Sequence, residues 1–126
     1  MKVLLDTNTF LWGLSAPQKL SPTPRKAVAS CERLLSVASI WEVLIKVRIG
    51  KLTLPIPAGE YLTSQMSTNG VSVLSIEIDH VLQIENLPMH HRDPFDRILI
   101  AQSMEEDWPV ITSNPVFKKY PVRVIW

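Results

Sequence analysis

The chain has 126 residues, of which 46% are hydrophobic, and a formal net charge of +1. This length predicts one domain over residues 1–126, and the near-neutral charge means that any phosphate-binding surface has to come from local clustering of basic residues. A single cysteine, Cys31, excludes an internal disulfide and fits a reducing compartment. No apolar run reaches the roughly 18 residues that span a bilayer, so we expect a soluble, cytoplasmic protein without a membrane segment.

Short apolar runs alternate with segments of helical spacing along the whole chain. Strands are predicted, in order, over residues 3–5, 34–37, 71–76, 109–112 and 122–125. Helices are predicted over residues 7–14, 24–32, 39–49, 58–68, 77–86 and 94–106. Thr23 and Pro24 fit an N-cap and first helical position, and Gly50 fits a helix stop. The alternation predicts an α/β fold around a mostly parallel sheet.

Four acidic residues occupy equivalent places in this pattern. Asp6 follows the first strand, Glu42 lies early in the helix after the second, and Asp93 and Asp96 open the helix that precedes the fourth. In an open α/β sheet the carboxyl ends of the strands and the following helix starts meet at one edge, where ligands bind. We therefore expect these acids, which are far apart in the sequence, to share one site.

Carboxylates gathered in one pocket repel one another. Two of them 5 Å apart cost roughly 3 kcal/mol at an effective dielectric near 20, so the cluster needs a neutralising partner. Oxygen ligands suit Mg²⁺ or Mn²⁺, and such a cation can activate water for attack on a phosphodiester. The pattern therefore favours metal-dependent hydrolysis of a nucleic-acid backbone.

Helix capping is the alternative explanation for each acid. Ser39 and Glu42 have the spacing of a capping box, and Asp93 and Asp96 have the same layout around Pro94. Asp6 would in the same way cap the first helix. From the spacing alone, capping and metal binding both stay open.

Four segments resemble, in order, the motifs of PIN-domain ribonucleases of the VapC type, which are toxins of type II toxin–antitoxin pairs. They are Val3 to Trp12; Ser39 to Val43 with Ile45, Lys46 and Gly50 to Leu52; His91 to Arg97 with Leu99 to Gln102; and Val110 to Asn114 with Phe117 and Tyr120. The resemblance implies a three-layer α/β/α sandwich with a parallel sheet of four to five strands. It also implies a metal-dependent endoribonuclease that forms homodimers and is inhibited by a cognate antitoxin.

The resemblance also assigns roles to residues. Asp6, Glu42 and Asp96 correspond to the catalytic acids that bind Mg²⁺ or Mn²⁺. Asp93 corresponds to an extra acid, with either a metal-related role or a capping role. Many relatives have an aspartate where this chain has Asn114, which puts a second metal in doubt and leaves a one-metal site or a simple turn as alternatives.

Other polar residues near these motifs have two possible roles each. Supporting roles at the site or in turns are predicted for Thr7, Asn8, Thr112 and Asn114. RNA contacts or ordinary solvated positions are predicted for Lys46, Arg48, Lys51, Arg92 and Arg97. Lys46 also has the spacing of an ion pair with Glu42. His90 and His91 lack the third ligand of a zinc set, which favours a surface loop or an RNA contact.

Two rival functions remain open from the sequence. A phosphotransferase with Asp6 as nucleophile would usually carry a second aspartate two residues later, where Asn8 stands. A non-catalytic PIN-like module that binds RNA or protein would fit the loss of an acid at Asn114. The endoribonuclease is the function that the four ordered motifs favour.

Overall fold

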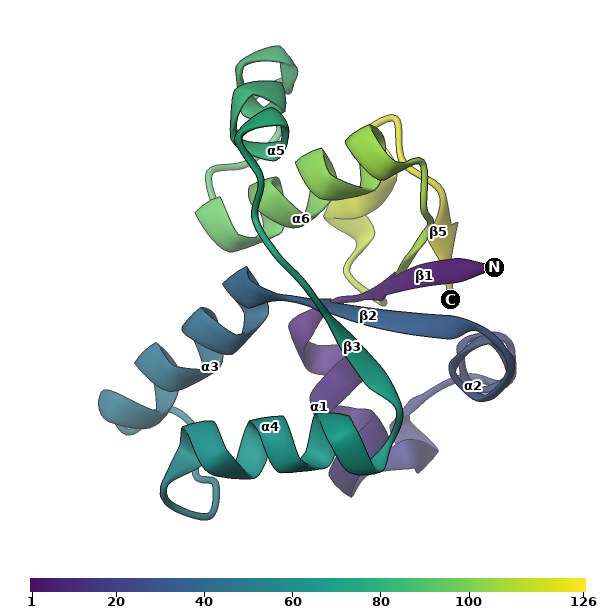
Figure 1. Ribbon diagram of the computed structural model, residues 1–126. Helices are drawn as coiled ribbons and strands as arrows, with labels where there is room; N and C mark the ends of the chain where they lie inside the picture. The colour runs from purple at the N-terminus through teal and green to yellow at the C-terminus, as the bar shows by residue number, and fades with distance from the viewer.

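A parallel sheet lies between two layers of helices in the computed structural model, which describes the backbone of residues 1–126 and every side chain except that of Val28 (Figure 1). The strands are β1 (Lys2–Leu5), β2 (Glu32–Ser36), β3 (Val71–Leu74), β4 (Val110–Ile111) and β5 (Val124–Ile125). The α-helices are α1 (Thr7–Ser15), α2 (Pro22–Ser30), α3 (Val37–Arg48), α4 (Ala58–Thr68), α5 (Ile78–Gln83) and α6 (Pro94–Glu106). Short 3₁₀ helices are η1 (Pro17–Lys19), η2 (Ile84–Asn86) and η3 (Pro115–Lys119).

The strand order is β3-β2-β1-β4-β5, and every neighbouring pair is parallel. β1 is central, and Val3, Leu4 and Leu5 are at most 2% exposed. A strand covered on both faces is expected to be apolar throughout, as this one is. The predicted parallel α/β sheet is therefore confirmed, with five strands.

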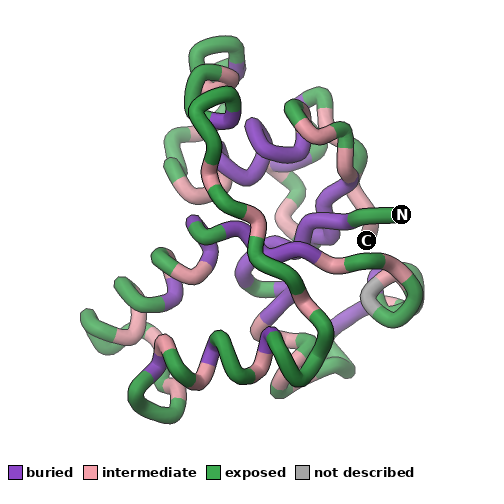
Figure 2. Tube along the Cα trace, viewed as in Figure 1, coloured by how far each residue is buried: buried purple, intermediate pink, exposed green. Residues whose placement is uncertain are grey.

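Alternate residues of the central strands enter two separate cores. Leu4 and Val110 pack with α6 on one face of the sheet. Leu5 and Ile111 pack on the other face with side chains of α1, α3 and α4. Figure 2 shows the buried residues along the sheet and on the inward sides of these helices. This arrangement confirms the three-layer sandwich. Within the described part of the chain, no helix is long and apolar enough to cross a membrane.

The start of α3 differs from the prediction. The helix begins at Val37, and the Ser36 hydroxyl, at the end of β2, accepts a hydrogen bond from the Ala38 backbone N–H at 3.1 Å. Ser39 is therefore not the cap but a buried residue inside the first turn. Glu42 lies one turn further into the helix, which excludes the proposed capping box.

The start of α2 also differs. The helix begins at Pro22 after Ser21, rather than at Pro24 after Thr23. Both prolines are tolerated because N–H groups in the first turn have no partner within a helix. The helix ends at Ser30, because Glu32 already pairs with Lys2 in the sheet.

Candidate active site

Asp6 follows the last residue of β1 and is 7% exposed. Its Oδ1 accepts a hydrogen bond from the Thr9 backbone N–H at 2.7 Å, so it caps α1 as the simpler interpretation predicted. Its Oδ2 accepts a hydrogen bond from the Thr112 hydroxyl, just beyond β4, at 2.6 Å. Asp6 therefore caps α1 and also links the end of β1 to the residue that follows β4.

Glu42 projects from α3 toward the start of α1. The hydroxyl of the buried residue Thr7 donates to its Oε1 at 2.7 Å. Lys46, one helical turn further on, places Nζ 3.0 Å from Oε2. The predicted ion pair between these two residues is therefore present, and Glu42 itself has no capping role.

Asp93 and Asp96 open α6 but are held differently. Asp93 is the N-cap, and its Oδ1 accepts hydrogen bonds from the backbone N–H groups of Phe95 and Asp96 at 2.9 and 3.2 Å. Asp96 instead directs its Oδ2 toward His91 Nε2 and Asn114 Nδ2, at 3.3 and 3.4 Å. Asp93 is thus a cap at the surface, while Asp96 faces the end of β4.

Asn114 presents its amide nitrogen, not its oxygen, to Asp96. The oxygen, Oδ1, accepts a hydrogen bond from the Val116 backbone N–H at 3.1 Å and caps η3. The backbone N–H of Asn114 donates to the hydroxyl of Thr112 at 3.0 Å. In this arrangement, the side chain of Asn114 acts as a hydrogen-bond donor to Asp96.

Electrostatic interactions link the four acids. Burial raises the pKa of Asp6 above 3.8, and the charge of Glu42 raises it further, against the lowering effect of the hydrogen bonds from Thr112 and Thr9. Burial, together with the charges of Asp93 and Glu42, raises the pKa of Asp96 to about 6. The charge of Glu42 thus acts on the carboxyls of both Asp6 and Asp96.

The acids are neighbours but do not converge on one point. Among the described residues, no group of three His, Cys, Asp and Glu side chains is close enough to hold a metal ion. Each carboxylate turns toward its own donors, an arrangement that keeps the like charges apart. The donors are Thr9 and Thr112 for Asp6, Thr7 and Lys46 for Glu42, and His91 and Asn114 for Asp96.

A groove of about 390 Å³ runs past this site between α3 and the start of α6. Lys46, Lys51 and Arg92 line it, together with Glu42 and Asp93. Basic side chains here stand beside the acidic site, as an approach for phosphates requires. Lys46, Lys51 and Arg92 thus lie along the groove, and their contact with RNA stays a prediction.

The remaining predicted polar residues are placed differently. Arg48 is exposed on α3 but does not line the groove. The prediction of an RNA contact or a solvated position for Arg97 is wrong. Arg97 is 7% exposed, and its Nη1 donates to the carbonyl of Pro88 at 2.9 Å. Asn8 is exposed, and its side chain makes no hydrogen bond to the described residues.

The contact between His91 and Tyr120 is a feature of the site that sequence reasoning missed. Tyr120 is buried in the core beneath α6, and its hydroxyl lies 2.7 Å from His91 Nδ1. The two residues are 29 positions apart, and no local pattern connects them. Only the fold brings Tyr120 against the segment that leads into α6.

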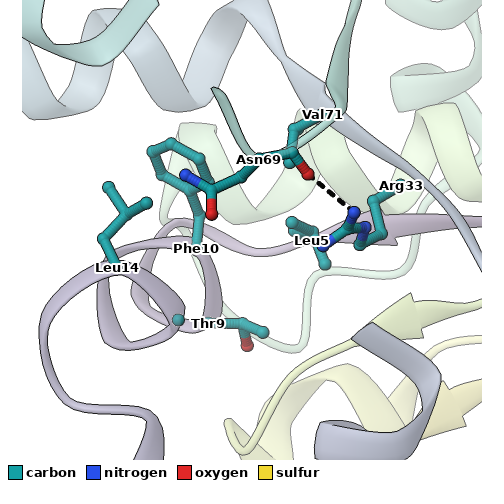
Figure 3. A pocket seen from close by; sticks show the side chains of 8 residues that line it. Leu5, Thr9, Phe10, Leu14, Arg33, Asn69 and Val71 are labelled. Carbon is teal, nitrogen blue, oxygen red and sulfur yellow. Dashed lines mark hydrogen bonds between the residues drawn. The ribbon is translucent and has the colours of Figure 1, made fainter. Parts of the chain in front are cut away.

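A second cavity lies between α1, β2 and β3 (Figure 3). Phe10, Leu14 and Val71 line it, and Arg33 spans it with a hydrogen bond from Nη2 to the carbonyl of Asn69 at 2.6 Å. Its volume is about 40 Å³, which is space for a few water molecules and not for a nucleotide. The acidic edge of the sheet is therefore the candidate site.

Fold and site together define a class: a parallel α/β sandwich with carboxylates from several elements at the carboxyl edge of its sheet. A family model described as PIN domain matches residues 3–122. The chain belongs to the PIN domain family.

Known proteins give a consistent comparison. A 47-residue segment is 45% identical to Ribonuclease VapC16 of Mycobacterium tuberculosis and covers 37% of this chain but only 33% of that protein. The fold resembles the VapBC2 structure from Rickettsia felis, bound to a DNA fragment from its promoter, with a TM-score of 0.72, 14% identity, and coverage of 98% of this chain and 97% of the other. A toxin–antitoxin complex from Klebsiella pneumoniae matches with a TM-score of 0.55, 18% identity, and coverage of 89% and 86%.

Proposed function

We propose that this protein is a Mg²⁺- or Mn²⁺-dependent endoribonuclease. The observation that carries the proposal is that Asp6, Glu42 and Asp96 come from three different elements and lie at one sheet edge. Thr112, Thr7 and Asn114 at the same edge donate hydrogen bonds to them. Membership of the PIN family and the segment shared with a ribonuclease support the same activity.

The chemistry of the donors suits a hard divalent cation, although no three acidic or histidine side chains of the described residues are close enough to hold one in the arrangement seen here. All the acids offer oxygen, and burial and mutual repulsion penalise their charged forms, which a cation would relieve. Asp6, Glu42 and Asp96 would hold it, with Asp93 close by. Bound there, the cation supplies Lewis-acid activation of water and of the phosphodiester.

The protein's own groups orient the acids and bind the strand. Thr112 and the Thr9 backbone N–H fix Asp6, and Thr7 fixes Glu42. Lys46 and Arg92 stand along the groove, where they would contact RNA phosphates. Lys46 also holds Glu42 through its ion pair of 3.0 Å, so one ammonium group stands beside both the acid and the groove.

Purified protein, free of any partner, tests the activity. RNA cleavage should require Mg²⁺ or Mn²⁺, stop on addition of EDTA, and be lost in Asp6→Asn. Asp107→Asn is the matched control, because Asp107 is a 93% exposed aspartate at the far end of α6 in a backbone conformation that asparagine tolerates. Equal cleavage by wild type and Asp6→Asn would overturn the proposal.

A non-catalytic RNA- or protein-binding module is the second candidate, and the amide that Asn114 presents to Asp96 favours it. Calorimetric titration separates the two, since absence of binding at millimolar Mg²⁺ and Mn²⁺ would support the module. Nucleophilic catalysis by Asp6 has less support, because both carboxylate oxygens are buried acceptors of hydrogen bonds.

We also propose that the protein acts in the cytoplasm as a homodimer paired with an antitoxin. The similarity to the fold of a toxin–antitoxin complex supports the pairing, and exposed apolar side chains such as Trp41 and Ile49 supply contact surface. Gel filtration with multi-angle light scattering of the isolated chain tests the dimer.

A further inference from the structure

The hydroxyl of Tyr120 lies between a buried cation and the imidazole of His91. Tyr120 is 4% exposed. Its oxygen is 3.2 Å from Arg97 Nη1 and 2.7 Å from His91 Nδ1. The other ring nitrogen, Nε2, lies 3.3 Å from Asp96 Oδ2. Four side chains therefore form a continuous chain of polar contacts that ends on a proposed metal ligand.

The position of each proton follows from the chemistry of the donors. A guanidinium group only donates, so Arg97 donates to the Tyr120 oxygen. The hydroxyl proton is then free to point to His91 Nδ1, which accepts it. A neutral imidazole that accepts at Nδ1 carries its proton on Nε2, and this N–H faces Asp96.

The opposite tautomer would place two unfavourable contacts in the same space. A proton on Nδ1 would have to share the Tyr120 oxygen with Arg97 and would leave the hydroxyl proton without its acceptor. The lone pair on Nε2 would then face the carboxylate of Asp96. Arg97, buried and fixed by the carbonyls of Pro88 and His91, thus acts on the His91 ring through Tyr120.

We propose that Tyr120 and His91 are positioning residues, which fix an N–H donor on Oδ2 of Asp96. Asn114 donates to the same oxygen, so the pair of donors leaves Oδ1 without a hydrogen bond from the described residues and available to a cation. The inference rests on the proposed function, in which Asp96 binds the metal. Groups that orient a ligand in this way change metal affinity about 10- to 100-fold.

The ring state is measured first, in metal-free protein. With ¹⁵N-labelled histidine, the two ring nitrogens of His91 should give one protonated and one unprotonated signal, with the proton on Nε2. His80 is an internal reference, because its Nδ1 accepts the Glu77 backbone N–H at 2.9 Å and its tautomer is fixed independently. Tyr120→Phe should leave His80 unchanged and lower the share of His91 that carries its proton on Nε2, because Asp96 alone then favours that tautomer. An unchanged, single His91 tautomer in Tyr120→Phe would overturn the proposal.

Metal affinity is measured next, by titration with Mn²⁺. Tyr120→Phe and His91→Ala should each weaken binding about tenfold, while His91→Gln, which keeps an N–H near the position of Nε2, should stay within about threefold of wild type. Tyr61→Phe on α4 is the matched control and should bind as wild type. Tyr120→Phe should add less than about twofold in the His91→Ala background, because Tyr120 acts through His91.

Two results would overturn the proposal here. One is an unchanged affinity for Mn²⁺ in His91→Ala, a test that does not require Tyr120→Phe to fold. The other is a full tenfold loss on adding Tyr120→Phe to His91→Ala. If wild-type protein binds no Mn²⁺, the proposed function fails, and the tautomer measurement still decides whether the contacts act as described.

Discussion

The hydroxyl of Thr112 stabilises a carboxylate that is buried at the end of β1. Thr112→Val keeps the shape but removes the hydrogen bond to Asp6 Oδ2. A hydrogen bond to a charged group contributes about 1.5–3 kcal/mol, so we expect this loss in the free energy of unfolding at pH 7. Urea denaturation measures it.

The loss should shrink near pH 4. Burial raises the pKa of Asp6 above 3.8, so the carboxyl takes up a proton there and depends less on its donor. The control is Thr68→Val, an exposed threonine at the end of α4, which should change little at either pH. Equal losses for Thr112→Val at both pH values would contradict this account.

Substitutions of Asp93 test whether the N-cap of α6 is also a metal ligand. Asp93→Ala removes the hydrogen bonds to the first turn of α6 and should cost about 1 kcal/mol, while Asp93→Asn keeps the cap and the stability. We expect Asp93→Asn to retain RNA cleavage within tenfold and Asp96→Asn to abolish it. Loss of cleavage in Asp93→Asn, with unchanged stability, would instead make Asp93 a ligand.

Two arginines of the same segment should respond in opposite ways. Arg97→Lys removes the geometry that reaches the Pro88 carbonyl and the Tyr120 hydroxyl, and should destabilise the protein by about 1–3 kcal/mol. Arg92→Lys, at an exposed groove position, should leave thermal stability unchanged and weaken RNA binding slightly. Thermal melting and RNA binding at two salt concentrations check the pair. A loss of stability in Arg92→Lys but not in Arg97→Lys would contradict a structural role for Arg97 and a surface role for Arg92.

Helix starts show the limit of local sequence patterns. The cap at Asp93 was predictable because proline follows it and fixes the first turn. Around α3, both Ser36 and Ser39 fit a cap, and pairing of Ser36 with Leu74 at the end of β2 decides between them. Strand pairing is a long-range contact, so the sequence spacing alone placed Glu42 one turn too early in its helix.

At the scale of the whole molecule, the raised pKa values predict an unusual dependence of stability on pH. The folded state binds more protons than the unfolded chain between pH 3.8 and about 6, because Asp96 has a pKa of about 6 and that of Asp6 is also raised. Their contribution to stability is therefore greatest at the acid end and is lost as the pH rises through about 6. After allowance for solvent screening, Asp96 accounts for about 1–2 kcal/mol.

Stability measurements without metal check this prediction. The free energy of unfolding should fall between pH 4.5 and 7, and Asp96→Asn should flatten the curve and be more stable than wild type at pH 7. Mn²⁺ at 100 times its dissociation constant should raise the free energy of unfolding of the wild-type protein by about 2.7 kcal/mol. The same concentration should have less effect on Asp96→Asn. A rise in stability with pH in wild-type protein would refute the assignment.

The acidic edge was predictable, and its supporting contacts were not. Asp6, Glu42 and Asp96 were located from strand and helix order, because a parallel sheet brings its carboxyl ends together. The link from Tyr120 to His91 and the direction of the Asn114 amide depend on packing of η3 beneath α6, which no spacing in the sequence records.

The place of β1 between β2 and β4 also affects how the protein matures on the ribosome. The hydroxyl that holds Asp6 belongs to Thr112, which is made 106 residues later, and β4 must pair with β1 to bring it there. A nascent chain that stops before β4 therefore carries the acids without the neighbour that orients Asp6. If the protein cuts RNA, incomplete translation products should be harmless to the cell that makes them.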